Sequence, residues 1–169
     1  MGKEGMKNMA ASSVLISGLG GLGLEVAKNI ILAGVKSVTL HDTKRVTMKD
    51  LSSQYFLKKE HLNQNRAAVS KSSLSELNSY VPIYLLEQNL TKECLKNFNI
   101  VVLTESSLEE QKEINKFCHY NGIKFINSNT YGLFGQIFCD FGEGFIVNDS
   151  TGEEAQSVLI QGITKVNSN

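Results

Sequence analysis

The sequence predicts an α/β fold in which a mostly parallel, Rossmann-like sheet is flanked by helices. An apolar run at 14–17 leads directly into a Gly-x-Gly-x-x-Gly turn at Gly18, Gly20 and Gly23, and an amphipathic helix follows the turn. A second apolar run ends in Asp42, about nineteen residues after Gly23. Further apolar runs of strand length then alternate with helical patterns, which is typical of parallel strands joined by crossover helices.

The glycine turn and Asp42 are the candidate binding residues. Gly18 would allow the tight turn, Gly20 would let a phosphate approach the backbone, and Gly23 would let the helix pack closely on the strand. The N-H groups and positive dipole end of the helix would face an anion, and Asp42 would take ribose hydroxyls. The alternative is a turn retained only because strand and helix pack closely through it.

The remaining elements follow from periodicity and helix-stop signals. A central strand at 100–103 is a continuous apolar run, as expected for a strand buried on both faces. We predict helices over 21–33, 62–80, 90–98 and 108–121, and strands over 14–17, 35–41, 83–86, 100–103 and 123–126.

The pattern changes to strands alone from Leu133 onward. Strand candidates cover 136–141, 145–147 and 157–161, with glycine and turn residues between them. We therefore expect two units: a Rossmann-like domain over 1–139 and the beginning of a small, incomplete all-β module over 140–169.

Composition limits the possible partners and compartments. The chain has 169 residues, 17 basic and 17 acidic side chains and a formal charge of zero, so no long-range field would attract nucleic acid or an anionic membrane. The polar N-terminus is unlike a signal peptide and the apolar runs are strand-sized, so we expect a soluble intracellular protein. Cys94, Cys118 and Cys139 are widely spaced, which indicates neither a disulfide framework nor a zinc site.

Several segments, in the same order, closely resemble the ubiquitin-activating enzyme family. They include Gly-Leu-Gly-Gly-Leu-Gly at 18–23, Val-Thr-Leu-His-Asp at 38–42, Asp-Leu-Ser-Ser-Gln at 50–54 and Gly-Leu-Phe-Gly-Gln-Ile-Phe-Cys-Asp-Phe-Gly at 132–142. The resemblance covers almost the whole chain and is specific to the N-terminal, inactive adenylation half. It implies a ThiF/MoeB-type fold, followed from residue 140 by the start of the first catalytic-cysteine half-domain.

The resemblance also implies a function. The full enzyme would activate the ubiquitin C-terminus with ATP, first as an adenylate and then as a thioester. ATP and magnesium would be bound by the active adenylation half of the same enzyme. This half would be structural and would assemble with the active half and with ubiquitin. Through the full protein it would also work with ubiquitin-conjugating enzymes. The expected compartments are the cytoplasm and the nucleus.

Departures from the active half's pattern predict that this chain is inactive alone. The loop at 50–55 lacks the arginine of the active half's Asn-Leu-Asn-Arg-Gln-Phe sequence, and Asp42 is followed by Thr43 and Lys44 rather than completing Asp-x-Asp. Thr104-Glu105-Ser106-Ser107 replaces the magnesium-binding aspartate. We therefore expect no catalytic residue, no metal ligand and no tightly bound cofactor, with Gly18, Gly20, Gly23 and Asp42 forming a vestigial nucleotide loop.

Other interpretations remain open from the residues. The open glycine at position 20 permits weak nucleotide binding, and Glu105 could hold magnesium. The 18–42 segment alone is also compatible with an independent nucleotide-binding protein, either an active adenylating enzyme or an NAD-dependent oxidoreductase. His41 and His119 could form a metal or acid-base pair, although core or surface histidines explain the pattern better.

Overall fold

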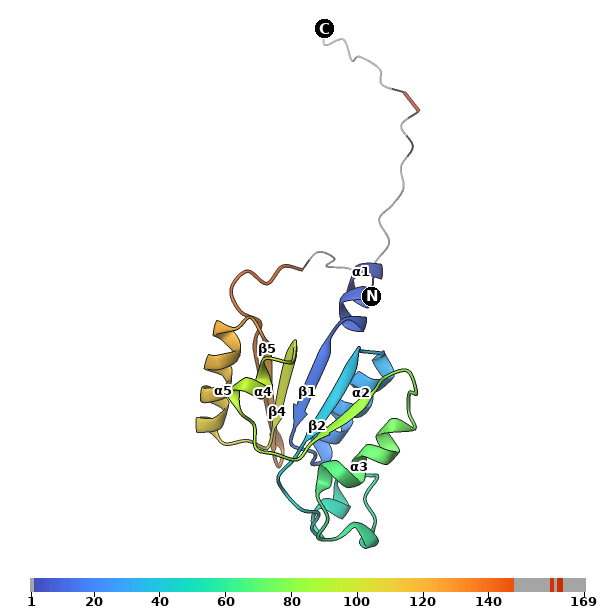
Figure 1. The fold of residues 1–169 in the computed structure, drawn as a ribbon, viewed down its shortest axis with the longest axis vertical. Helices are drawn as coiled ribbons and strands as arrows, with labels where there is room; N and C mark the ends of the chain where they lie inside the picture. Colours follow the sequence, from blue (N-terminus) through green and yellow to red (C-terminus); the bar gives the residue numbers. More distant parts are fainter. Residues whose placement is uncertain (1, 148–158, 160, 163–169) are drawn as a thin grey trace.

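All strands of the described chain lie in one six-stranded sheet of order β3-β2-β1-β4-β5-β6. The computed structural model describes residues 2–147, 159, 161 and 162 (Figure 1). The first five strands are parallel, and β6 is antiparallel to β5. The strands are β1 Ser13–Ser17, β2 Ser37–His41, β3 Ile83–Leu86, β4 Ile100–Thr104, β5 Lys124–Tyr131 and β6 Phe134–Asp140.

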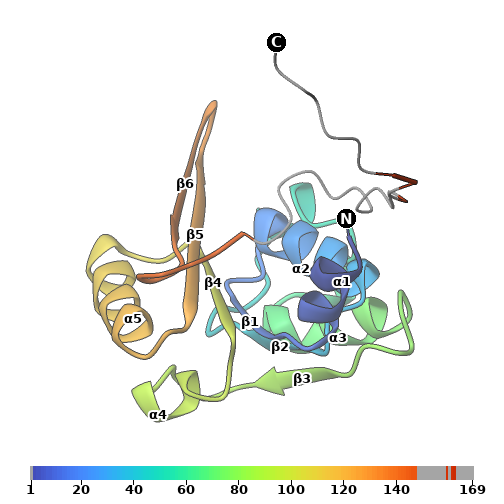
Figure 2. The same ribbon diagram turned by 90° about the horizontal axis from the view of Figure 1, so that it is seen from above.

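Helices cover the sheet on both faces, as Figure 2 shows. Strand β1 supplies both cores because successive side chains point to opposite faces. Its Val14 and Ile16 pack in the cluster under α2 Gly21–Ala33 and α3 Arg66–Ser75. Leu15 packs in the second cluster, with α4 Lys92–Leu95 and α5 Leu108–Tyr120. The short N-terminal helix α1, Lys3–Ala10, contacts the first cluster through Met9.

Helix α2 has the position that the glycine pattern predicts. It begins immediately after Gly20 and ends at Gly34, which takes the left-handed conformation with φ of 85°. Such a glycine commonly ends a helix because it has no Cβ to strain. The carboxyl end of β1 and the start of α2 therefore meet beside β2 and β4, where the strand order reverses and where ligands of such sheets usually bind.

Two helices are shorter than the sequence predicts. The helix expected over 62–80 is α3, which starts only after Asn65, whose side chain accepts a hydrogen bond from the Ala68 N-H at 3.0 Å. The preceding residues Lys59–His61 form a 3-10 turn, and another covers Asp50–Ser52. The helix expected over 90–98 is reduced to α4, which follows the N-cap Thr91. These caps fix helix starts that periodicity alone places too early.

The predicted change to strands after Leu133 begins inside the main sheet. Its first strand is β6, which pairs along its length with β5 and so completes the main sheet. The resulting hairpin extends beyond the helices (Figure 2). The strand expected over 145–147 is not formed, because these residues make no sheet pairing. The strand expected over 157–161 and most of the predicted β module lie outside the described residues.

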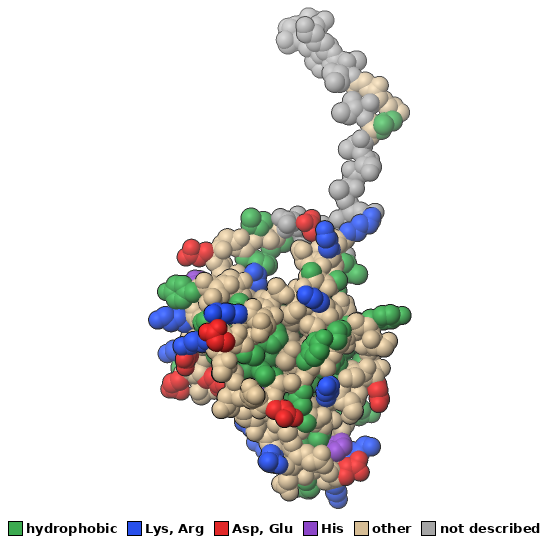
Figure 3. Space-filling view, viewed as in Figure 1, with side chains coloured by type: hydrophobic (Ala, Val, Ile, Leu, Met, Phe, Trp, Pro, Cys, Tyr) green, Lys and Arg blue, Asp and Glu red, His purple; other side chains and the backbone are tan. Residues whose placement is uncertain are grey.

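The surface charge agrees with the balanced composition. On the face that Figure 3 shows, acidic and basic side chains are interspersed, and no large area carries a single sign. Among the described residues, no helix is long and apolar enough to cross a membrane.

Candidate functional site

Two of the three motif glycines have the structural roles that the sequence predicts. Gly18 has a φ of 94°, the left-handed conformation that a tight turn requires. A Cβ added at Gly23 would overlap the carbonyl oxygen of Gly18. The first glycine thus turns the chain and the third lets α2 pack against the turn.

Asp42 lies at the end of β2, next to the turn, with only 3% of its surface exposed. Its Oδ2 accepts a hydrogen bond from the Leu19 N-H at 2.6 Å, and its Oδ1 accepts one from the Lys44 N-H at 2.8 Å. Oδ2 also receives the Arg66 side chain. The carboxylate for which the sequence predicts contacts to ribose hydroxyls is therefore engaged by donors of the chain itself.

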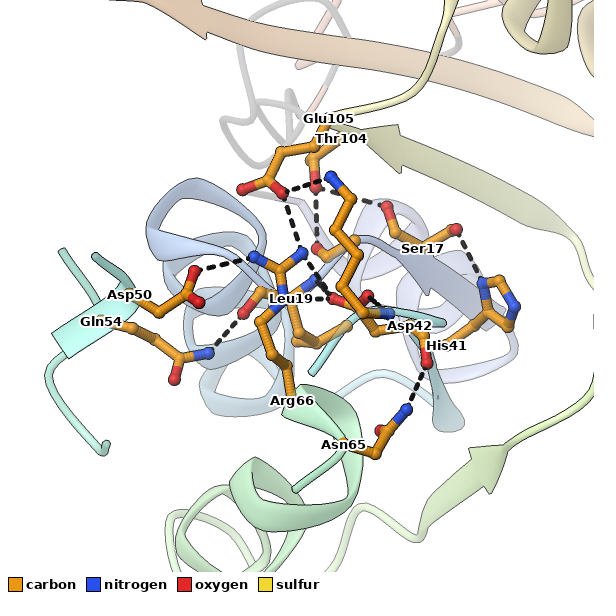
Figure 4. A network of polar contacts seen from close by, with 12 residues as sticks. Ser17, Leu19, His41, Asp42, Asp50, Gln54, Asn65, Arg66, Thr104 and Glu105 are labelled. Atoms are coloured by element: carbon orange, nitrogen blue, oxygen red, sulfur yellow. Dashed lines mark hydrogen bonds and ion pairs between the residues drawn. The ribbon is translucent and has the colours of Figure 1, made fainter. Parts of the chain in front are cut away.

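Arg66, the first residue of α3, is the centre of the site (Figure 4). Its side chain is 4% exposed, and all three of its guanidinium nitrogens contact carboxylates. Nε donates to Asp42 Oδ2 at 2.9 Å, Nη1 to Asp50 Oδ1 at 3.0 Å and Nη2 to Glu105 Oε2 at 2.8 Å. Arg66 therefore joins the end of β2, the 3-10 turn at Asp50 and the end of β4.

Glu105 places its carboxylate over the glycine turn. A Cβ added at Gly20 would overlap Glu105 Oε1, so the space that an open glycine leaves at this position is occupied by the chain itself. The other oxygen, Oε2, contacts Lys44 Nζ at 3.2 Å as well as Arg66. Glu105 has a φ of 57°, which is unusual for a residue other than glycine, and its N-H donates to Asn129 Oδ1 at 2.7 Å.

The five charged side chains of this site carry more negative than positive charge. We call them the Arg66 network: Asp42, Lys44, Asp50, Arg66 and Glu105. Three carboxylates against two cations give a formal charge of −1.

The pKa values of the network show how closely its charges are coupled. Burial acts to raise the pKa of Glu105, but hydrogen bonds and the charges of Arg66 and Lys44 lower it below its usual range. Burial likewise opposes the lowering of the Asp50 pKa, which hydrogen bonds from Thr47 and Arg66 cause. Burial would lower the pKa of Arg66, but the three carboxylates raise it. Asp50, Arg66 and Glu105 are therefore all ionised at neutral pH.

The network separates two hollows at the carboxyl end of the sheet. The inner cavity, of about 370 Å³, lies toward α4 and α5 and includes His41 and Phe117 in its lining. The outer hollow, of about 1040 Å³, lies beside the start of α2 and reaches the hairpin tip at Tyr131 and Gly132. Lys44, Arg66 and Glu105 line both. A ligand extending from Asp42 in the inner cavity to Gly21 in the outer hollow would have to pass these three side chains.

Arg66 is not among the residues that the sequence patterns indicate. The loop at 50–56 supplies no cation, but Arg66 and Lys44 reach the site from other segments. Arg66 fell inside a predicted helix that began at residue 62. Asn65 is a good N-cap residue, and using it as the helix start would have placed Arg66 at the helix end nearest Asp42.

The other candidate side chains are not brought together. His41 is buried, with its Nδ1 2.8 Å from Ser17 Oγ, and burial lowers its pKa despite the nearby Asp42 charge. His119 instead contacts Asp140 at the far end of α5. Cys118 is buried, with a pKa raised by burial to about 11, whereas Cys139 is exposed. Among the described residues, no group of three His, Cys, Asp or Glu side chains could hold a metal ion.

Comparisons with known proteins agree with this fold. A family model described as the ThiF family matches residues 1–163. Ubiquitin-like modifier-activating enzyme 1 of Homo sapiens is 52% identical over 167 residues, which are 99% of this chain. Ubiquitin-activating enzyme E1 1 of Schizosaccharomyces pombe is 52% identical over 164 residues, or 97% of the chain. The chain spans only 16% of the length of each of these relatives.

A solved structure gives the same result for the fold at much lower identity. The crystal structure of E. coli MccB superposes with a TM-score of 0.73 and 19% sequence identity. The match covers 82% of this chain and 44% of the MccB chain. At this identity the similarity supports the shared fold alone.

Proposed function

Because the chain belongs to the ThiF family, and because its curated relatives are ubiquitin-activating enzymes, we propose that it is the N-terminal, inactive adenylation half of such an enzyme. The identity of about half over nearly the whole chain supports this assignment. In the full enzyme, ATP-dependent activation of the ubiquitin C-terminus would take place in another half. This half would support that active half and contribute to holding ubiquitin.

The Arg66 network is the observation that carries the proposal of inactivity. A working adenylation site needs free cations to neutralise the triphosphate. Here each nitrogen of Arg66 is held by a carboxylate, and Lys44 pairs with Glu105. A triphosphate would bring several negative charges to a site whose own formal charge is −1. Displacing Asp42 or Asp50 from Arg66 would leave a mostly buried carboxylate without its cation, which is strongly destabilising.

The contacts of Glu105 also bear on where magnesium and ATP would bind in the full enzyme. Glu105 is the one side chain that the sequence offers as a magnesium ligand, and its Oε2 forms ion pairs with Arg66 and Lys44. We therefore propose that ATP and magnesium bind the active half and that this chain holds neither tightly. The alternative of an independent nucleotide-dependent enzyme would require Asp42 to be available for ribose, and Arg66 and Leu19 already engage it.

An exposed apolar surface supports a partner half. Leu133 is fully exposed, Phe134 is 77% exposed and Ile137 is 73% exposed on the β5–β6 hairpin. We call these three residues the hairpin patch. Several large apolar side chains exposed on one projecting element are more typical of an interface than of a monomer surface. We propose that the hairpin patch packs against the active half.

Ubiquitin-dependent exchange of labelled pyrophosphate into ATP tests the proposed function. The chain alone should give no exchange above the level without ubiquitin. Adding the remainder of the enzyme as a separate polypeptide should restore exchange, because the pseudodimer would then reassemble. Exchange by the chain alone would contradict the proposal, and so would a remainder that is fully active without it.

A further inference from the structure

We propose that the Glu105 carboxylate occupies an anion-binding position over the glycine turn. Removing this carboxylate would expose the position as a binding site for inorganic pyrophosphate and similar anions. This inference rests on the proposed function, because it explains how the turn is kept unoccupied. It adds a single residue that is responsible for closure. It also predicts a gain of binding, which inactivity alone does not.

The position of the carboxylate is the first argument. Glu105 Oε1 lies where a Cβ of Gly20 would be, directly against the backbone that begins α2. The first turn of α2 has no side-chain cap and contains no acidic residue of its own. The positive end of the helix is stabilised by nearby negative charge. Glu105 supplies that charge from the end of β4, across the turn.

The cations around the carboxylate are the second argument. Glu105 Oε2 lies 2.8 Å from Arg66 Nη2 and 3.2 Å from Lys44 Nζ, so two cations and a helix start converge on one carboxylate. This is the arrangement that proteins use for phosphate-like anions. Removing the Glu105 charge changes the formal charge of the Arg66 network from −1 to zero. It also leaves Arg66 Nη2 and Lys44 Nζ without their contact to Glu105 Oε2.

The exposure of the Glu105 side chain is the third argument. Its side chain is 36% exposed, whereas that of Arg66 is 4% exposed and that of Asp42 is 3% exposed. The outer hollow of about 1040 Å³ adjoins it and has room for the carboxylate or for an incoming anion. Arg66 would stay in place without Glu105, since Asp42 and Asp50 hold its other two nitrogens.

The test is a gain of pyrophosphate binding by the variants Glu105→Ala and Glu105→Gln. The alanine removes both charge and volume, and the glutamine removes charge alone. We expect Glu105→Ala to bind pyrophosphate at least about tenfold more tightly than the unchanged chain in calorimetry, with amide resonance shifts at Gly20 and Gly21. Glu105→Gln should gain less, because its amide still fills the space over Gly20.

Two further variants make the experiment specific. Glu109→Ala removes one exposed carboxylate from the first turn of α5, outside the network, and should leave pyrophosphate binding unchanged. Adding Lys44→Gln to Glu105→Ala should lower the gained affinity several-fold, because Lys44 is exposed and can be replaced without burying a charge. Circular dichroism would establish that each variant is folded.

The outcomes separate this inference from the proposed function. A folded Glu105→Ala chain that gains no binding would overturn the role of Glu105 and leave the proposed inactivity intact. An equal gain in Glu109→Ala would also overturn it, because the effect would then be one of net charge. If the unchanged chain already binds pyrophosphate as tightly as Glu105→Ala, both the closure and the proposed inactivity are contradicted.

Discussion

Arg66 Nη2 lies 2.8 Å from Asp42 Oδ2, so the carboxylate at the end of β2 is paired with the first side chain of α3. Both side chains are almost fully buried. The same nitrogen reaches Glu105, and Nη1 reaches Asp50. A region where Rossmann-like sheets commonly bind nucleotide is therefore occupied by an internal ion-pair network.

Removing Arg66 should destabilise the chain strongly. Arg66→Gln would leave Asp42 buried without its cation, and breaking a buried pair in this way costs about 3–5 kcal/mol. Arg66→Lys should cost less but still destabilise, because one ammonium cannot reach three carboxylates with the geometry of a guanidinium. Urea unfolding monitored by circular dichroism measures both. A loss below about 1 kcal/mol in Arg66→Gln would show that the network contributes little.

The second and third glycines of the motif should respond differently to substitution. At Gly23 a side chain meets the backbone of Gly18, so Gly23→Val should cost about 1–3 kcal/mol through overpacking. At Gly20 the neighbour is the end of the Glu105 side chain, which can move and which would pair with an arginine. Gly20→Arg should therefore leave the melting temperature nearly unchanged. Equal losses in the two variants would contradict these roles.

Acid should weaken the fold partly through Glu105 and Asp50. Burial opposes ionisation of both, but Arg66 and other hydrogen-bond donors lower both pKa values from ordinary values of 4.5 and 3.8. A carboxyl whose pKa is lower in the folded state contributes stability above its unfolded pKa and loses it as pH falls through the folded pKa. Stability should fall from about pH 4.5 downward, and less steeply in Glu105→Gln. Parallel pH profiles for the two proteins would contradict this.

The hairpin patch should control association without controlling folding. Leu133→Ser with Phe134→Ser should leave the melting temperature unchanged, because both side chains are exposed, and should weaken binding to the remainder of the enzyme. Tyr80→Ser is the matched control, since Tyr80 is 93% exposed but lies outside the hairpin. Sedimentation velocity measures the complex. Association that is lost equally in the control, or retained in the hairpin variant, would contradict an interface at the patch.

The sequence predicted the elements of the fold better than the contacts of its site. Strand β1, the turn at Gly18 and helix α2 are local, so apolar spacing and glycine position identified them. The ion pairs of the Arg66 network join residues 16 to 61 positions apart, and local periodicity does not predict such pairs. Likewise, the pattern after Leu133 predicted a strand, but only the tertiary structure shows that β6 pairs with β5. Local sequence patterns do not specify which residues distant in the sequence pair with one another.

Calorimetric titration of the chain with ATP and magnesium tests the central claim most directly, with NAD as the second ligand. The network leaves neither a free cation for phosphate nor a free Asp42 carboxylate for ribose. The account predicts no saturable heat for either ligand at concentrations up to about 1 mM, which corresponds to less than about 4 kcal/mol of binding free energy. Stoichiometric binding of ATP and magnesium with a dissociation constant near 1 μM, about 8 kcal/mol, would contradict it.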